Sequence, residues 1–239
     1  FLGRLIGIGY LLPLIYFSFK IKITKLINLY FIFLLICFQG FLGWYMVSSG
    51  LVDRIDVSHF ILSAHLLIAF FILSLIYWNY LKLIKINKIS RKLNIIFPLS
   101  FLILIFIQIS VGAFVSGMDA GKIYNSWPLM GNSYFPNDNS VNNLFKFTAL
   151  SDPSLVQFIH RNLAYGIGIF YLVIFYKIYG NKMYDLYKSI NYLGFFIILQ
   201  IFLGILTILN GAHIYIASLH QISSCLLYTS DAADEWLRG

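Results

Sequence analysis

Long apolar stretches dominate this sequence and restrict its fold more than any other feature. A helix that crosses a bilayer needs about 20 mostly apolar residues, because its backbone polar groups must be satisfied within the segment. Stretches of this kind occupy residues 1–19, 26–47, 58–81, 95–116, 155–179, 189–210 and 213–229. The chain is 60% hydrophobic and 11% charged, which is too apolar for a soluble core with a polar surface. We therefore predict an all-α, multi-pass membrane protein.

The basic residues are distributed unevenly between the loops that join these stretches. The loops after the first, third and fifth stretches contain Lys20, Lys22, Lys25, Lys82, Lys85, Lys88, Arg91, Lys92, Lys177, Lys182 and Lys188. The alternate loops contain a balanced set: Asp53, Arg54, Asp56, Asp119, Lys122, Asp138, Lys146 and Asp152. Loops rich in Lys and Arg remain on the cytoplasmic or matrix side. The balanced loops are predicted to face the periplasm or intermembrane space, across a bacterial or mitochondrial inner membrane.

The charged and sulfur-containing residues exclude several function classes. The net charge of +8 follows from the basic inner loops, so it indicates anionic lipid headgroups as partners rather than nucleic acid. Cys37 and Cys225 both lie in apolar stretches and predict no disulfide in an outer loop. The single glutamate is Glu235, and every aspartate lies in a predicted loop or in the tail. An ion-coupled transporter usually needs an intramembrane carboxylate, so transport is disfavoured.

An internal repeat relates the two halves of the chain. The segment Gln39 to Gly43 reads QGFLG, and Gln200 to Gly204 reads QIFLG, at an offset of 161 residues. By the same comparison the first, second and third stretches match the fifth, sixth and seventh. A displacement by four helices preserves orientation, so the halves should be related by an axis along the membrane normal.

The repeat predicts two parallel four-helix bundles, and this sequence holds about seven of the eight helices. We expect an amino-terminal bundle at 1–116, an outer loop at 117–154 and a carboxy-terminal bundle at 155–226. Residues 227–239 turn abruptly polar and acidic and resemble translated adapter sequence, so they are interpreted as an artefactual tail. The pattern also leads us to expect that the chain is truncated at its amino terminus and near its carboxy terminus.

Three histidines lie within the predicted spans and are the main candidates for chemistry. From the outer side, His65 lies about seven residues into the third stretch, His160 about five into the fifth and His220 about seven into the seventh. His65 and His220 are equivalent in the repeat. Two imidazoles at one depth in a helical bundle can ligate a haem iron from both faces. The competing interpretation is that each imidazole only hydrogen-bonds a neighbouring helix.

The roles of the other ionisable residues near the outer ends of the helices remain undecided from the sequence. Arg161, directly after His160, and Arg4 can pair with haem propionates or extend to lipid headgroups. His59 and His213 lie at the predicted surface, where a solvated role is favoured and no site role is assigned.

Several segments together resemble haem A synthases of the mitochondrial and alphaproteobacterial, cysteine-poor type. They are the run from His160 to Tyr165 (HRNLAY), Ala64-His65, Leu219-His220-Gln221, the QxFLG pair and the loop GMDAGKIYNSWPLM from Gly117 to Met130. The loop is the most specific of these features, and the resemblance covers nearly all of residues 1–226.

The resemblance implies an oxidoreductase that converts the C8 methyl group of haem O to a formyl group, giving haem A for cytochrome c oxidase. His160 and His220 would be axial ligands of a b-type haem, His65 would bind the iron of the substrate haem, and Arg161 would contact cofactor. A catalytic glutamate and a further haem histidine would lie upstream of Phe1, so this fragment by itself would be inactive. The implied partners are haem O, the enzyme that makes it and oxidase assembly factors; oligomeric state stays open, a homo-oligomer included. The alternative is a dihaem b-type membrane cytochrome that only transfers electrons.

Overall fold

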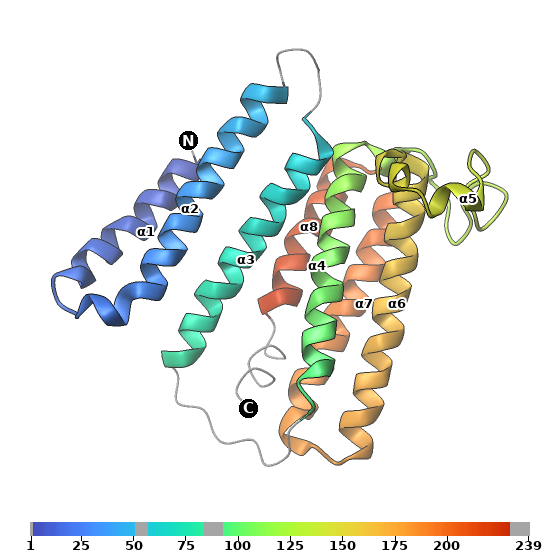
Figure 1. Ribbon diagram of the computed structural model, residues 1–239. Helices are drawn as coiled ribbons and strands as arrows, with labels where there is room; N and C mark the ends of the chain where they lie inside the picture. Colours follow the sequence, from blue (N-terminus) through green and yellow to red (C-terminus); the bar gives the residue numbers. More distant parts are fainter. Residues whose placement is uncertain (1, 51–56, 84–92, 230–239) are drawn as a thin grey trace. The chain divides into compact units, whose positions relative to one another are not determined.

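The computed structural model describes residues 2–50, 57–83 and 93–229 (Figure 1). The long helices are α1 (Leu2–Ser18), α2 (Ile23–Gly50), α3 (His59–Leu83), α4 (Ile96–Gly117), α6 (Pro153–Gly180), α7 (Tyr187–Leu209) and α8 (Ile214–Thr229). Short helical turns are η1 (Ala120–Lys122), α5 (Val141–Leu144), η2 (Phe147–Ser151) and η3 (Tyr184–Leu186). Within these described ranges the only β pairing is an isolated bridge between Met130 and Ser133. The predicted all-α class is confirmed.

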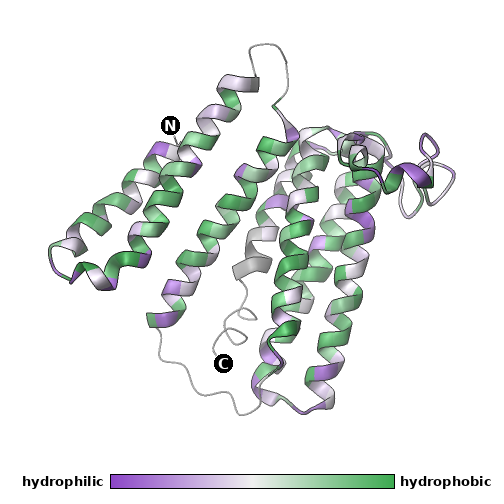
Figure 2. Cartoon of the chain, in the orientation of Figure 1, coloured by the Kyte–Doolittle hydropathy of each residue, from purple (hydrophilic) through white to green (hydrophobic). Residues whose placement is uncertain are grey.

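The helices coincide with the apolar stretches of the sequence. Five are long and apolar enough to cross a bilayer, namely Ile23–Ser49, His59–Leu83, Ile96–Gly117, Pro153–Gly180 and Tyr184–Leu209. Helices α1 and α8 are shorter, with 17 and 16 residues. Figure 2 shows hydrophobic residues along the lengths of the helices and hydrophilic ones mainly at their ends and in the loop after α4. This distribution is that of a multi-pass membrane protein.

The structure divides the chain into two compact units, Phe1–Ile84 and Lys85–Gly239. Helix α4 therefore belongs with α6, α7 and α8, whereas the sequence led us to place residues 95–116 with the first bundle. The physical reason is that α4 packs along α6, and the two share a core around Phe101, Ile105 and Ile174. The second unit thus contains four long helices in the part of the chain that the structure describes.

The first unit is built from α1, α2 and α3, with α2 packed against both of the others. Polar contacts between α1 and α2 are local: the Tyr10 hydroxyl donates to the Leu29 carbonyl at 3.1 Å, and the hydroxyls of Ser18 and Tyr30 lie 2.6 Å apart. Large apolar side chains such as Phe31 remain exposed. Exposed apolar side chains along a spanning helix are suited to contact with lipid.

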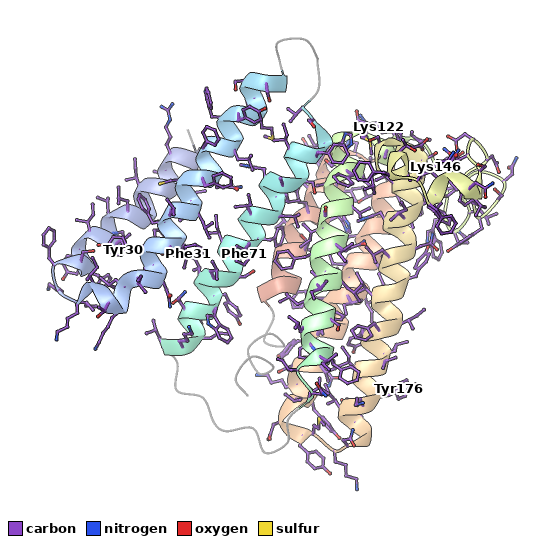
Figure 3. All side chains as sticks on the ribbon, viewed as in Figure 1. Tyr30, Phe31, Phe71, Lys122, Lys146 and Tyr176 are labelled. Atoms are coloured by element: carbon purple, nitrogen blue, oxygen red, sulfur yellow. The ribbon has the colours of Figure 1, made fainter. Side chains whose placement is uncertain are left out.

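The second unit has an apolar core that runs along α4, α6 and α7. Ile174, Ile178 and Ile190 are fully buried in it, and α8 packs along α7. Lys122 and Lys146 lie at the end of this unit where α6 begins, and Tyr176 lies toward the other end of α6 (Figure 3). The turn with Lys177, Lys182 and Lys188 therefore lies at the opposite end from the long loop, as the predicted inner and outer sides require.

Some sequence predictions fall outside the described residues. These are the outer-loop residues Asp53, Arg54 and Asp56, the inner-loop residues Lys85, Lys88, Arg91 and Lys92, and positions 230–239 of the expected tail. The first residues of that tail, 227–229, continue helix α8.

Candidate functional site

The three candidate histidines lie at matching depths in their helices. His65 is the seventh residue of α3, His160 the eighth of α6 and His220 the seventh of α8. At about 1.5 Å per residue each lies roughly 10 Å from the start of its helix. The expected five-residue depth of His160 was too shallow, because α6 starts earlier than its apolar run. Pro153 occupies the first turn, and the Asp152 side chain accepts a hydrogen bond from the Leu155 N–H.

Each histidine makes the same pair of contacts with a glutamine and a glycine of a neighbouring helix. Gln39 of α2 donates to the His65 carbonyl at 2.8 Å, Gln108 of α4 to that of His160 at 3.2 Å, and Gln200 of α7 to that of His220 at 3.2 Å. Four residues after each glutamine, a glycine faces the imidazole. A methyl group at Gly43, Gly112 or Gly204 would lie 3.1, 3.1 or 3.3 Å from Cε1 of the respective ring. We call this glutamine, glycine and histidine arrangement the histidine cradle.

The geometry of antiparallel helices explains the spacing within a cradle. A helical carbonyl points toward the C-terminus of its helix, whereas the side chain leans toward the N-terminus. The carbonyl and the ring of one histidine therefore lie about one turn apart along the axis. A partner helix meets both from positions i and i+4, which share one face. Glutamine suits the carbonyl, and glycine leaves room for the ring.

Each of the three imidazoles has a ring nitrogen without a hydrogen-bond partner among the described residues. Within the described part of the chain, Nδ1 of His65, His160 and His220 is buried without a hydrogen-bond partner. Each histidine is nevertheless partly exposed. A buried ring nitrogen without a partner is costly, and apolar helices with imidazole donors are a suitable environment for a haem iron. The residues present therefore fit a haem group.

His160 and His220 lie in the same structural unit. Both helices begin at the end of this unit where the long loop lies (Figure 1). His65 belongs to the first unit and has its own cradle there. Among the described residues no group of three or more His, Cys, Asp or Glu side chains is suited to a metal ion, and a haem iron with two axial imidazoles needs no such cluster.

Arg161 is held by the outer loop rather than left available at the end of its helix. Its side chain is only 6% exposed. Nη1 donates to the Ser126 carbonyl at 2.9 Å and to the Leu129 carbonyl at 3.4 Å, and Nη2 donates to the Tyr124 carbonyl at 2.9 Å. Neither sequence-based interpretation, a propionate partner or a headgroup contact, included this role. These contacts favour Arg161 as the anchor of the loop.

Further contacts hold the same loop against the helix ends of the second unit. Gln157 also donates to the Tyr124 carbonyl at 3.1 Å, and the Trp127 indole N–H donates to the Tyr165 hydroxyl at 2.8 Å. On the other side, the Asn125 amide donates to the Ile208 carbonyl at 3.0 Å, near the end of α7. The loop therefore forms hydrogen bonds with both α6 and the end of α7.

Two loop residues have perturbed acidities. Burial alone would raise the pKa of Asp152, but hydrogen bonds from Asn139, Ser154 and the Leu155 N–H outweigh it and lower the pKa below its ordinary value. Burial, and then the hydrogen bond to Asp138, raises the pKa of the Tyr124 hydroxyl. Asp152 is thus an ionised cap at the start of α6, where the helix dipole also favours negative charge.

The remaining sequence candidates lie apart from the cradles. His213 is exposed, and His59 is the first residue of α3, with its ring centroid 4.2 Å from that of Phe60. Arg4 is exposed on α1. From the sequence, Gln39, Gly43, Gln200 and Gly204 were recognised only as repeat markers, and Gln108 and Gly112 were missed. The shared spacing, glutamine followed by glycine four residues later, was the signal that would have identified them.

Comparison with known proteins agrees with these features. The family model described as cytochrome oxidase assembly protein, COX15-CtaA, matches residues 1–230. The chain belongs to this family. Similar members include proteins named haem A synthase from Pelagibacter ubique, 47% identical over 231 residues, which are 96% of this chain and 68% of the relative. The relative from Rickettsia bellii strain RML369-C is 41% identical over 233 residues, 95% and 69% of the two chains. One from Rickettsia prowazekii is 39% identical over 232 residues, with the same coverage of 95% and 69%.

Proposed function

We propose that this protein is a haem A synthase, an oxidoreductase that converts the C8 methyl group of haem O to a formyl group and so supplies haem A to cytochrome c oxidase. The observation that carries the proposal is the set of three intramembrane histidines at matching depth, each with a buried ring nitrogen that no group in the described part of the chain satisfies. Membership of a family whose relatives are named haem A synthase supports the same activity.

Each histidine has a distinct role in this proposal. His160 and His220 would hold a b-type haem in the second unit, and His65 would bind the substrate haem in the first. The haem groups supply the redox chemistry when bound. The chain contributes the imidazole ligands, the cradles that orient them and the apolar helix walls that exclude water.

The outer loop closes the end of the second unit in this proposal. Arg161 binds three loop carbonyls, and Gln157 binds one of them as well. Because these bonds hold the loop against α6, the loop limits access of water to the outer side of the His160 position. Arg161 thereby acts as a positioning residue for the loop, and its Nε–H, which has no partner among the described residues, is a donor left for a propionate.

The proposal includes a membrane orientation. The balanced outer loop faces the periplasm or intermembrane space, and the turn with Lys177, Lys182 and Lys188 faces the opposite side, where anionic lipids bind it. The haem sites then lie toward the outer face of a bacterial or mitochondrial inner membrane. Haem O is the substrate, and the enzyme that makes it and oxidase assembly factors are the expected partners.

Spectroscopy combined with pigment analysis tests the function. The protein, purified from membranes in mild detergent, is examined by a reduced-minus-oxidised spectrum, acid extraction and mass analysis of the pigments. Haem A or haem O together with haem B is the expected result. Haem B alone would favour a dihaem cytochrome that only transfers electrons, and a preparation free of haem would contradict both functions.

A further inference from the structure

We infer that the glutamine and glycine of each cradle are positioning residues that set the orientation of the histidine ligands: Gln39 and Gly43 for His65, Gln108 and Gly112 for His160, and Gln200 and Gly204 for His220. This inference rests on the proposed haem ligation and extends it to residues outside the set of ligands. It predicts that the affinity for haem and the spectroscopic signals of the bound haem depend on six residues that do not bind iron.

The glutamine fixes the backbone of the histidine. A helical carbonyl already accepts the N–H four residues later, and the glutamine amide uses its second lone pair. The bond ties the histidine to the neighbouring helix at the turn that carries the ligand. At His220 the same amide also donates to Ser223 Oγ at 2.7 Å, and that hydroxyl donates to the His220 carbonyl at 3.1 Å. In α4 the Gln108 amide nitrogen additionally lies 3.4 Å from Nε2 of His160.

The glycine fixes the ring. A methyl group at Gly43 or Gly112 would lie 3.1 Å from Cε1, so the imidazole would have to move by a few tenths of an ångström. Functional groups must hold their geometry to within about 0.5 Å. Such a displacement uses up much of that tolerance, so it should perturb the ligand geometry while leaving the helices folded.

Close helix packing alone does not account for these glycines. Gly3, Gly7, Gly40 and Gly166 also lie in spanning helices, and a methyl group on any of them would meet nothing within 4 Å. The glycines that the imidazoles approach are instead the ones four residues after a glutamine, whereas Gly194 faces Tyr171. The pattern recurs in three helix pairs, two of them within the same unit.

The test compares glycine and glutamine variants in the protein purified from membranes. Gly112→Ala and Gly204→Ala are set against Gly166→Ala, a control on a spanning helix where the added methyl group has open space. Gln108→Met and Gln200→Met keep the length of the side chain and remove the donor. His160→Ala and His220→Ala serve as reference variants. The measurements are haem B per polypeptide, the reduced-minus-oxidised spectrum and the low-spin electron paramagnetic resonance signal of the oxidised protein.

The expected result is roughly a 10-fold loss of haem affinity in the cradle variants, as is typical for residues that orient metal ligands, with a shifted resonance signal in the haem that remains. Gly166→Ala should match the unmodified protein. Wild-type haem content and signals in all four cradle variants, alongside loss of haem in His160→Ala, would overturn this inference alone. Retention of the b-type spectrum in both histidine variants would overturn the ligation itself. If an alanine variant fails to elute as a folded species, the two methionine variants decide.

Discussion

The α2–α3 pair of the first unit and the α7–α8 pair of the second contain the same cradle, but among the described residues the second unit adds another cradle and a long loop held by hydrogen bonds. Gln39 and Gly43 contact His65 as Gln200 and Gly204 contact His220. In the second unit α4 adds another cradle at His160, and the loop after α4 is fixed to the start of α6 by Arg161. Among the described residues, the repeated cradle is thus combined in the second unit with a loop that is fixed by hydrogen bonds.

This difference teaches that the two kinds of region depend on different interactions. A cradle needs one hydrogen bond from a glutamine and one glycine without a side chain on a neighbouring helix. It can therefore recur wherever the helix pair recurs. The loop depends in addition on hydrogen bonds to a buried cation, which are stronger than neutral ones. Changes in the cradles should therefore affect the haem, and changes at Arg161 should affect the order of the loop.

The largest expected effect is the difference between histidine variants in the two units. His160→Ala or His220→Ala should abolish the b-type spectrum, because each removes a proposed haem ligand, whereas His65→Ala should leave that spectrum in place and abolish formation of haem A. Reduced-minus-oxidised spectra and pigment analysis of the three variants measure this. His59→Ala is the control and should resemble the unmodified protein. Loss of the b-type spectrum in His65→Ala would show that the units do not divide the haems as proposed.

Arg161→Ala should release the loop. A hydrogen bond to a charged group contributes about 1.5–3 kcal/mol, so losing this anchor should favour local opening by at least about 2 kcal/mol, or roughly 30-fold. Limited proteolysis of residues 118–140 measures the opening. Lys146→Ala, which removes an exposed side chain bonded only locally to Asn143, is the matched control. Equal cleavage of both variants would mean that the guanidinium does not hold the loop.

Asp152→Ala should destabilise the start of α6 by about 1 kcal/mol, the usual contribution of an N-cap. Because the pKa of Asp152 is lowered in the folded protein, this contribution is complete above the pKa of an unfolded aspartate, about 3.9. It is lost as the pH falls through the lower folded value. Thermal unfolding in detergent at pH 7 and at low pH should show a difference between variant and parent that shrinks with acid. A difference that is independent of pH would contradict the role of the ionised cap.

The smallest expected effect concerns a single loop contact. Trp127→Phe keeps an aromatic ring and removes the indole N–H that donates to Tyr165, so the loop should open more easily by about 0.5–1 kcal/mol. The proteolysis assay used for Arg161 measures it, and Tyr165→Phe should give a similar change through the same bond. If the two changes add fully in the double variant, the two side chains do not interact.

The sequence by itself determined the class of the fold, the positions of the long helices and which three histidines are candidates for the site. Apolar runs of this length can be satisfied only as spanning helices, and the boundaries follow the ends of the runs to within a few residues. The His160 to Tyr165 run and the loop from Gly117 to Met130 were sufficient to indicate the family. These features are local or compositional, and they need no knowledge of which helices touch.

Only the tertiary structure decided which helices share a unit and what surrounds each histidine. The grouping of α4 with α6 depends on side-chain packing between helices, and in a uniformly apolar sequence every face of a helix looks equally suited to pack. For the same reason the sequence did not connect Gln108 and Gly112 with His160. The sequence also left the hydrogen-bond partners of Arg161 undetermined. They are backbone carbonyls 32 to 37 residues away, and carbonyl groups are present at every position of a sequence.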